Sequence, residues 1–343
     1  MSQHLFLLGD INFKGMADTS RNFVSVEPLL ASADVVFANL ECCFHTPPPQ
    51  AEERRGFYVD PALAGALRDA HLHVVGNANN VNIGRAAILE TNRVLDALGI
   101  AHVGAGADAE RAHAPVVIHR DGVRYGFLQR TAVYWPDNHE AGPGLPGVAV
   151  IKGHTAYRPA LQQQAARTRP GVPPEVVTWA DRDSLTQFAR DVSALRAQAD
   201  IVVASVHWGY RRDVLDYQRE FAHAAIDAGA DVVFGHGPHT MLPIETYLGR
   251  PIFYGLGNFS FHMAHTADVH HEWVGMIVQA RVEAGRLAAW TLRYVERDAE
   301  NRTGVVRMDR HPEEYARLQV QAERMGATLR PHSDGMACDL AFA

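Results

Sequence analysis

The stretch IVVASVHWGYRRDVLDYQREFAHAAIDAGADVVFGH (residues 201–236) decides the fold class. It begins with an apolar run, Ile201 to Val206, that is typical of a buried strand. An amphipathic segment from Gln218 to Ala228 predicts a helix, and the run from Asp231 to Phe234 predicts a second strand. A strand, a helix and a strand in this order indicate a parallel unit, so the chain is predicted to have an α/β fold.

Three earlier segments repeat the pattern of an apolar run that ends in polar residues. Leu5 to Leu8 is followed by Gly9-Asp10, Ala33 to Phe37 leads to Asn39-Leu40-Glu41, and His73 to Val75 is followed by Gly76-Asn77. A helix-like segment, Ala86 to Leu98, comes next. In α/β sheets the active site lies beyond the carboxyl ends of the strands, so the polar residues at these ends are candidate site residues.

The second half of the chain has a different organisation. Glu272 to Val282 and Leu287 to Val295 are β-rich runs separated by Glu283-Ala284-Gly285-Arg286, which predicts a hairpin. Residues 136–175 are rich in Pro and Gly and predict a long functional loop. Residues 301–343 predict an irregular extension with one amphipathic helix near Pro312 to Met325. Since the sequence shows no linker, we expect this extension to pack on the same domain as residues 1–300.

Composition excludes several classes of protein. The 343 residues are 47% hydrophobic and 21% charged, which are ordinary globular values, and the net charge of −7 gives no attraction to nucleic acids or anionic membranes. No apolar run is long enough for a membrane span. The start MSQHLFLLGD lacks the basic segment of a signal peptide, and three cysteines cannot form a disulfide framework. We therefore expect a cytoplasmic protein with no nucleic-acid partner and no membrane association.

Five predicted strand ends carry residues that can bind a metal ion. They are Asp10, Glu41, Asn77, His207, and His236 together with His239. Carboxylate, amide and imidazole ligands suit Mn, Fe, Zn, Mg or Ca, and imidazole favours the first three. A single Asp or His at a strand end is more often a cap or a structural polar residue. The ordered series predicts a site for one or two divalent ions at the carboxyl ends of the strands.

The same motifs resemble a known family. The order GD, NLE, a Gly/Asn-rich turn, HWG, GHGPH and Tyr254-Gly255-Leu256-Gly257-Asn258-Phe259 is similar to CapA-type proteins, which are named for capsule and poly-γ-glutamate synthesis and belong to the calcineurin-like metallophosphoesterase superfamily. The most specific part is residues 207–261, within a resemblance over roughly residues 4–295. It implies that residues 1–300 form a calcineurin-like αββα sandwich with a mono- or dinuclear metal centre. The implied ligands are Asp10, Glu41, Asn77, His207, His236 and His239.

The chain departs from the family pattern at the third motif. CapA-type proteins resemble NNHxxDxG there, whereas this chain reads NANNVNIG, which puts Asn79 at the expected His and Asn82 at the expected Asp. Either Asn77 or the Ala78 position corresponds to the family's ligand Asn. In phosphoesterases that His is the acid that helps the alkoxide leave, and an amide cannot transfer a proton at neutral pH. The departure therefore argues against ordinary phosphoester hydrolysis.

Other residues are candidates for acid/base work and substrate binding. We predict Asp10, His154, His207 and His239 as the catalytic set, with His154 lying in the Pro/Gly-rich loop where it can fold over the site. His139, His262 and His265 are alternatives, and each has a surface or capping role as its simpler explanation. Arg130, Arg211 and Arg212 are candidates to bind a carboxylate, although most arginines are solvated.

Three functions follow from these residues and the resemblance. The first is a metal-dependent acid/base enzyme that acts on a peptide, with epimerisation at an α-carbon as the leading reaction, because the CapA-type family includes the lasso-peptide C-terminal residue epimerases. The second is a metal-dependent hydrolase of phosphoesters or of poly-γ-glutamate-type amides. The third is an inert CapA-like protein that binds a peptide. In each case the expected partner is a peptide or poly-amino-acid chain.

Overall fold

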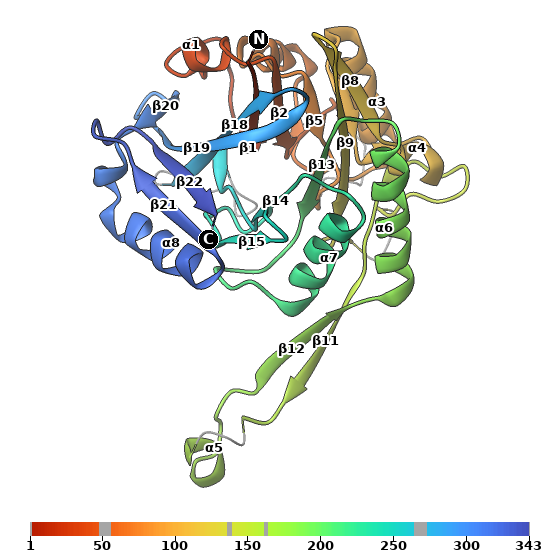
Figure 1. Cartoon of the computed structure of the whole chain (residues 1–343). Helices are drawn as coiled ribbons and strands as arrows, with labels where there is room; N and C mark the ends of the chain where they lie inside the picture. The colour runs from red at the N-terminus through yellow and green to blue at the C-terminus, as the bar shows by residue number, and fades with distance from the viewer. Residues whose placement is uncertain (1, 48–55, 136–138, 161–163, 264–272, 343) are drawn as a thin grey trace.

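A computed structural model describes residues 2–47, 56–135, 139–160, 164–263 and 273–342. Most of its strands belong to two sheets (Figure 1). The larger has the order β21-β22-β19-β18-β1-β2-β5-β6, with β17 beside β1 and β20 beside β19. Its strands are β1 (Gln3–Asn12), β2 (Val35–Leu40), β5 (Val74–Gly76), β6 (Ala101–Val103), β17 (Asn258–Phe261), β18 (Val274–Glu283), β19 (Arg286–Arg297), β20 (Thr303–Val306), β21 (Ala327–Pro331) and β22 (Cys338–Phe342).

The second sheet has the order β15-β16-β14-β13-β9-β8. Its strands are β8 (Val116–Arg120), β9 (Val123–Thr131), β13 (Ile201–His207), β14 (Val232–His236), β15 (Ile244–Tyr247) and β16 (Arg250–Phe253). Strands β9, β13, β14 and β16 run parallel, as do β1, β2, β5 and β6 of the larger sheet. The predicted α/β class is therefore confirmed.

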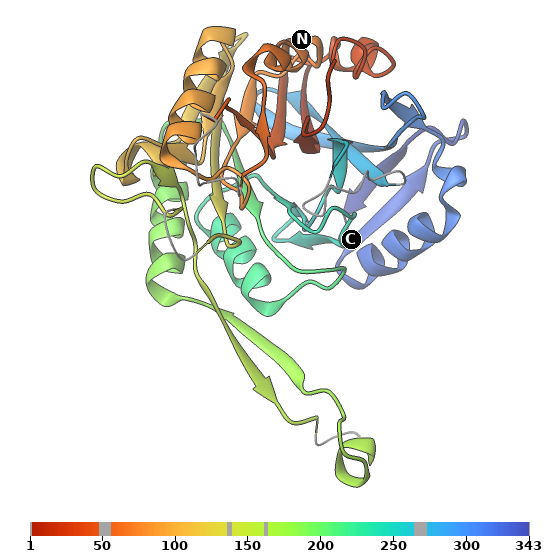
Figure 2. The ribbon, with the colours of Figure 1, turned by 180° about the vertical axis from the view of Figure 1, so that it is seen from behind.

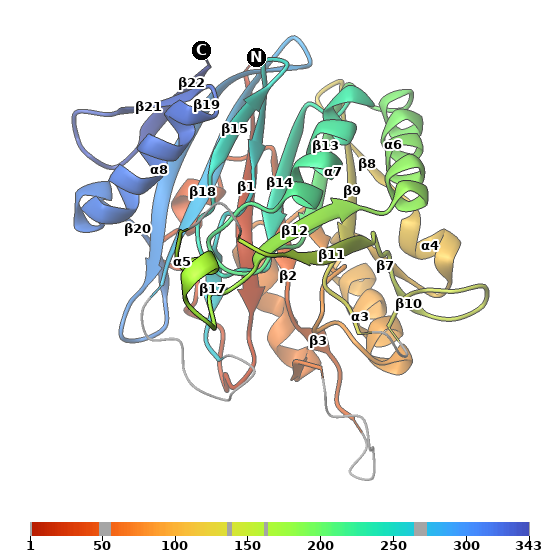
Figure 3. The same ribbon diagram turned by 90° about the horizontal axis from the view of Figure 1, so that it is seen from below.

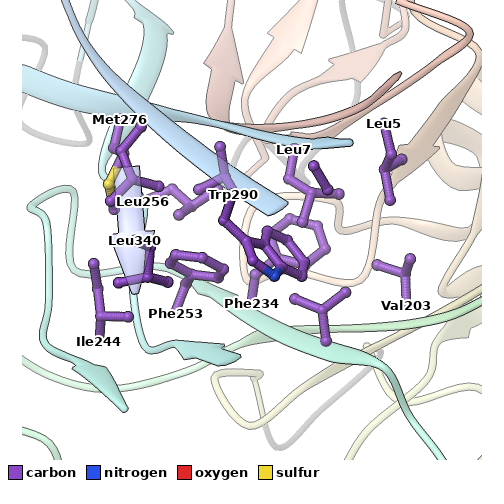
Figure 4. Packing of buried hydrophobic residues seen from close by; sticks show 14 of the residues in the cluster. Leu5, Leu7, Val203, Phe234, Ile244, Phe253, Leu256, Met276, Trp290 and Leu340 are labelled. Carbon is purple, nitrogen blue, oxygen red and sulfur yellow. The ribbon is translucent and has the colours of Figure 1, made fainter. Parts of the chain in front are cut away.

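Alternating side chains place the two sheets face to face. Leu5 and Leu7 of β1 pack in one core cluster with Val203 of β13, whereas Phe6 and Leu8 of β1 point to the opposite face and belong to another. Figure 4 shows apolar residues of both sheets meeting in the first cluster. This period of two is what a strand covered on both faces requires. The shared core is therefore the layer between the two sheets.

Helices cover the outer face of each sheet. On the larger sheet, α1 (Glu27–Leu30), η1 (Pro61–Gly65), α2 (Ala66–Asp69) and α3 (Arg85–Leu98) contribute to the cluster around Phe6 and Leu8. On the second sheet, α6 (Arg182–Arg196) and α7 (Asp216–Asp227) pack over β13 and β14, and Figures 1 and 2 show them on one side of the molecule. The layers are thus helix, sheet, sheet and helix.

The C-terminal segment is more regular than expected. Residues 301–343 were predicted to be irregular, but they form β20, η2 (Met308–Arg310), α8 (Pro312–Arg324), β21 and β22. Strand β22 pairs with β19 and so extends the larger sheet, and the predicted helix is confirmed as α8. The prediction missed the strands because β22 is a short strand in which the buried Cys338 and Leu340 alternate with the exposed Asp339.

The Pro/Gly-rich region also differs from the prediction of a loop. It contains β10 (Gly147–Val148), which pairs with β7 (Ala105–Gly106), followed by β11 (Gly153–Arg158), α5 (Gln164–Thr168) and β12 (Glu175–Ala180). Strands β11 and β12 pair with each other in an antiparallel ribbon. This arm projects away from the two sheets (Figures 1 and 2), and Figure 3 shows it from its free end. Strands β11 and β12 therefore form a projecting arm, whereas β10 stays with the body of the molecule through its pairing with β7.

The remaining elements are short. Strands β3 (Cys43–Phe44) and β4 (Tyr58–Val59) form a small parallel pair, and α4 (Ala109–His113) precedes β8. The predicted hairpin is confirmed as β18 and β19, whose turn places Ala284 and Gly285 at φ values of 48° and 72°. No helix in the described residues is long and apolar enough to cross a membrane.

Candidate metal centre

The carboxyl ends of four parallel strands bring four candidate residues to one edge of the molecule. Asp10 lies near the end of β1, Glu41 directly follows β2, and His207 and His236 end β13 and β14. His236 Nδ1 lies 3.3 Å from Asp10 Oδ1, and His207 Nε2 lies 3.6 Å from Glu41 Oε1. Both contacts cross from one sheet to the other. The site is therefore built where the two sheets meet, from residues far apart in sequence.

His239, in the loop after β14, joins the same group. Its Nδ1 lies 3.2 Å from Asp10 Oδ2, and its Nε2 lies 3.7 Å from Glu41 Oε1. Ligand atoms of Asp10, Glu41 and His239 all lie within 4.8 Å of one another. This spacing allows one ion to contact all three side chains, so these residues form a cluster that can hold a metal ion.

Asp10 and His239 shift each other's pKa values in opposite directions. Burial alone would raise the pKa of Asp10, but hydrogen bonding and the charges of His236 and His239 outweigh burial and hold it well below its ordinary value. Burial alone would lower the pKa of His239, but the charge of Glu41 and the hydrogen bond and charge of Asp10 raise it to about 9. The close pairing of Asp10 and His239 therefore favours the charged form of both side chains.

The backbone around the cluster requires glycine at two positions. A Cβ on Gly9, directly before Asp10, would meet the carbonyl oxygen of Gly257 at 2.0 Å. Gly237, between His236 and His239, has a φ of +115°, and a Cβ there would meet the carbonyl oxygen of Trp208 at 2.7 Å. His239 itself has a φ of 55°, an uncommon value for a residue other than Gly. Such conformations cluster at functional sites because the surrounding structure must hold them.

Many buried polar atoms of the site have no hydrogen-bond partner among the described residues. They are Asp10 Oδ2, Glu41 Oε2, Asn77 Oδ1, His207 Nε2, both ring nitrogens of His236, and Asn258 Nδ2. Unsatisfied buried polar atoms are rare in folded proteins and each one destabilises the fold. All but the Asn258 amide nitrogen are atoms of the kinds that bind divalent cations. The residues present therefore fit the metal ion that the family implies.

Asn77 is the better placed of the two alternatives in the third motif. It follows β5, is fully buried, and has a carbonyl oxygen without a partner, whereas Ala78 has no ligand atom. Asn79, at the position of the family's His, has its amide committed to the backbone: Nδ2 donates to Leu40 O at 2.8 Å and Oδ1 accepts from Asn82 N at 3.0 Å. Asn79 thus acts as a structural residue of the turn.

The structure does not bring every predicted residue to the cluster. His154 lies on β11 of the arm with a side chain 48% exposed, and its Nε2 lies 3.2 Å from Asp181. Its other described contact is with the ring of Trp179, so no described contact joins it to the metal ligands. Its prediction relied on a loop folding back, and the observed arm points outward instead. His265 lies outside the described residues.

Two further candidates are used elsewhere in the structure. His139 is buried between backbone groups, because its Nδ1 accepts from Trp135 N at 3.0 Å and its Nε2 lies 3.1 Å from Asn82 O; burial lowers its pKa to about 4. Arg130 is buried and pairs with Asp191 at 2.5 Å, which excludes it as a surface clamp for a carboxylate.

Sequence reasoning missed two groups next to the ligands. Asn258 opens β17, and its Oδ1 accepts a hydrogen bond from His239 Nδ1 at 3.0 Å. Its signal was present in the YGLGNF motif, where a Gly-Asn pair repeats the form of Gly76-Asn77. Thr131, at the end of β9, lies beside His207 with its Oγ1 at 3.5 Å from Nδ1. Sequence gives no signal for that contact, since it depends on the pairing of β9 with β13.

Comparison with known proteins identifies the family of the chain. The family model described as "Bacterial capsule synthesis protein PGA_cap" matches residues 4–263, which include all the predicted ligands. The chain belongs to the PGA_cap family. The predicted resemblance to CapA-type proteins is thereby confirmed.

Several known proteins are 27–31% identical to the chain over the aligned residues. The PGA biosynthesis protein CapA of Bacillus subtilis is 31% identical over 251 residues, covering 71% of this chain and 57% of the relative. A probable polyglutamine synthesis accessory protein of Mycobacterium tuberculosis is 31% identical over 66% of this chain and 55% of its own length. An uncharacterized protein of Sinorhizobium fredii is 27% identical over 70% of this chain and 61% of its own. The matched part is thus little more than half of each relative.

Proposed function

We propose that this PGA_cap protein is a metal-dependent enzyme that moves a proton at the α-carbon of a peptide substrate, with epimerisation as the net reaction. The group of unsatisfied ligand atoms at the junction of the two sheets carries the proposal. The helix, sheet, sheet and helix layers support assignment to the calcineurin-like αββα fold, in which residues 1–300 form the family domain and 301–343 complete its larger sheet.

The proposed ligands for one or two divalent ions are Asp10, Glu41, Asn77, His207, His236 and His239. A bound ion would act as a Lewis acid that stabilises negative charge on a substrate carbonyl oxygen. The mixed carboxylate, amide and imidazole set suits Mn, Fe or Zn better than Ca or Mg, because imidazole is a weaker ligand for the hard cations. The most deeply buried ligands lie at the ends of strands in both sheets, so the packing of the two sheets fixes their positions relative to one another.

The contacts of Asn79 favour proton transfer over phosphoester hydrolysis. Its amide bonds to backbone groups on both sides, so it neither titrates nor points a free donor at a leaving group. Phosphoester cleavage at neutral pH needs an acid for the leaving alkoxide, whereas removal of an α-proton needs a base and a stabilised enolate. Hydrolysis of an amide is the second candidate, because the same ligand set supports it.

Among the clustered histidines, His239 is the one that a substrate can reach. Its side chain is 27% exposed, whereas those of His207 and His236 are 2% and 0% exposed. Asn258 and Asp10 hold its Nδ1, which orients the ring. In a site that holds one ion through the other five residues, we assign removal of the α-proton to His239, with Asp10 and Asn258 orienting its ring and His207 lying beside Glu41. Solvent water supplies the proton to the opposite face, and the hydroxide that remains takes the proton from His239. His154 is not retained in the catalytic set.

The proposed substrate is a peptide or poly-amino-acid chain. Two relatives carry names that refer to PGA biosynthesis and to polyglutamine synthesis, both of which are chains of amino-acid residues. The net charge of −7 supports the absence of nucleic acid among the partners. A natural-product precursor peptide with a free C-terminal residue and an oligo-γ-glutamate are the two chemical forms to test.

The test is a mass-resolved incubation of the protein with such peptides in deuterium oxide after loading with Mn²⁺, Fe²⁺ or Zn²⁺. We expect a gain of one mass unit at an α-carbon without cleavage. Chelator and His239→Ala should abolish the gain. The control is His119→Ala, which removes an exposed histidine of β8 that pairs with Arg124 at the amino end of β9, away from the carboxyl end of that strand.

Other outcomes would support the competing functions. Chain cleavage, or phosphate release from an ester tested in parallel, would support the hydrolase and contradict α-proton transfer. Peptide binding without exchange or cleavage, by a protein that holds no metal, would support the inert binding protein and reject both enzymes.

A further inference from the structure

A buried amide stands behind Asp10 and joins the two sheets. Gln129 lies on β9 of the second sheet and is fully buried. Its Oε1 accepts from the backbone N of Ala78 at 2.7 Å, and its Nε2 donates to Asn39 Oδ1 at 3.0 Å. A backbone N–H can only donate, so the oxygen of Gln129 must face Ala78 and its NH₂ group must face Asn39. The direction of this amide is therefore set by the main chain.

Asn39 forms hydrogen bonds to both Gln129 and Asp10, so the orientation of the Gln129 amide fixes that of the Asn39 amide. Its Oδ1 is occupied by the NH₂ group of Gln129, so its Nδ2 points the other way and donates to Asp10 Oδ1 at 2.8 Å. Only one carboxylate oxygen of Asp10 is engaged by this bond. The other, Oδ2, has no hydrogen-bond partner among the described residues and lies on the side of His239.

The hydrogen bonds that run from Ala78 N through Gln129 and Asn39 to Asp10 form one relay, and a second relay ends at Asn77. Asn92, half-buried on α3, donates from Nδ2 to the carbonyl oxygen of Ala105 at 3.1 Å. A carbonyl can only accept, so Asn92 must turn its Oδ1 toward Asn77, whose Nδ2 donates to it at 2.9 Å. Asn77 Oδ1 is left buried and without a described partner.

We propose that Gln129 and Asn92 are positioning residues of the metal centre. A hydrogen bond to a backbone group fixes the orientation of each side-chain amide. Gln129 in turn orients the amide of Asn39, and Asn92 orients the amide of Asn77. As a result, Asp10 Oδ2 and Asn77 Oδ1 are left to bind the ion, and the NH₂ group of Asn77 is directed toward Asn92. The inference rests on the proposed metal site. It explains why residue 76 is Gly, since a Cβ there would lie 2.3 Å from the Gln129 amide carbon and close the path of the first relay.

A purely structural role would also account for buried amides, so the test needs a matched control. Gln3 supplies one, because it is buried, lies on the same strand as Asp10, and likewise joins the sheets: Nε2 donates to Arg120 O at 2.9 Å and Oε1 accepts from Tyr125 at 2.7 Å. It stands at the other end of β1, away from the ligands. Gln3→Met and Gln129→Met each remove the hydrogen bonds of one buried amide that joins the two sheets.

The experiment titrates Co²⁺ into the full chain and into Gln129→Met, Asn92→Leu and Gln3→Met, and follows the visible d–d bands. Loss of outer contacts to a metal ligand typically weakens binding about 10–100-fold, so we expect that loss in the first two variants and less than about twofold in the third. The d–d bands of the first two should also change at saturating Co²⁺, because the ligand oxygens are no longer held in place. Circular dichroism and urea unfolding verify that each variant folds.

The outcomes separate this inference from the proposed function. If the unmodified chain binds Co²⁺ and the folded Gln129→Met and Asn92→Leu variants bind it with the same affinity and spectrum, the relays are rejected and the metal site stands. An equal loss in Gln3→Met would also reject the relays, since it would indicate a general effect of packing. If the unmodified chain binds no Co²⁺, both the metal site and the relays are wrong. Should Gln129→Met not fold, Asn92→Leu decides, because Asn92 is only half-buried.

Discussion

The charged side chains at the two ends of the parallel strands differ in how they are paired. At the amino ends, Asp200 before β13 accepts three hydrogen bonds from Arg124, and Asp231 before β14 accepts from Arg196 at 2.6 Å and from Val202 N at 2.8 Å. The bonds from Arg124 lower the pKa of Asp200 to about 2. At the carboxyl ends, Asp10, Glu41 and the histidines keep atoms with no described partner.

The difference indicates what each end is for. Paired charges with backbone donors stabilise the fold and need nothing further. Buried ligand atoms held close together without matched donors destabilise the empty fold, and such an arrangement is retained when a ligand compensates it. A cavity of about 520 Å³ at the amino ends, lined by Arg196, Arg250 and Trp290 among others, is thus less informative about function than the tightly packed ligand cluster.

The largest expected effect is the loss of metal binding in Asp10→Ala. Asp10 contacts both His236 and His239, so its removal takes away one ligand and the group that orients two others. We expect affinity for Mn²⁺ or Zn²⁺ to fall by more than about 100-fold, the upper range for loss of an outer contact alone. Competition with a chelating dye measures this. Asp200→Ala is the control at the opposite end, and an equal loss there would contradict the comparison.

Metal binding should also stabilise the whole chain. An ion that binds only the folded state at 100 times its Kd adds about 2.7 kcal/mol to the free energy of unfolding. We expect urea unfolding to show a gain of this size on saturation with the preferred ion, and chelator should reverse it. The gain should be absent in Asp10→Ala. A wild-type chain whose stability is indifferent to every divalent ion would count against a metal centre.

Breaking a pair at the amino ends should have the reverse profile. Asp231→Asn leaves the guanidinium of Arg196 without its carboxylate, so we expect the free energy of unfolding to fall by about 2 kcal/mol. Metal affinity should stay within about twofold of wild type, because the change is at the other end of the strands. Urea unfolding and chelator competition on the same preparation measure both quantities. A weakened metal site with unchanged stability would invert the roles assigned to the two ends.

The sequence predicted the site better than its surroundings. Asp10, Glu41, His207 and His236 could be predicted because each lies at or near the end of a strand with an obvious apolar pattern, and parallel strands bring their carboxyl ends together. The strands β21 and β22 and the arm could not be predicted. Strand β22 has only five residues, and β11 is exposed along its whole length, so neither carries the longer apolar run of a buried strand.

The amide relays lie beyond sequence reasoning for a different reason. Gln129 and Asn39 are 90 residues apart and belong to different sheets, so their contact depends on how the sheets pack. Neither residue differs locally from an ordinary polar residue in or near a strand. Pattern and spacing thus identify the ligands, which follow strand order, whereas the groups that orient them depend on tertiary structure.

The smallest expected effect is a pH dependence of the metal-free chain. The pKa of His239 is raised to about 9, above its unfolded value of about 6.5, so its proton stabilises the fold fully below pH 6.5 and this contribution is lost as the pH rises through 9. Because the ring is 27% exposed, we expect a loss of only about 1 kcal/mol between pH 6.5 and 9.5.

Urea unfolding of the chelator-treated protein across this range measures the loss, and His239→Gln should remove it. The pair of Arg124 and Asp200 supplies the internal contrast. Its carboxylate has a pKa of about 2 and its guanidinium stays protonated, so neither group titrates between pH 6.5 and 9.5. Arg124→Met should therefore lower stability by the same amount at every pH in the range. If the free energy of unfolding of His239→Gln still falls between pH 6.5 and 9.5, the titrating group lies outside the metal centre. The contrast between the two ends of the strands would then not come from the charge of His239.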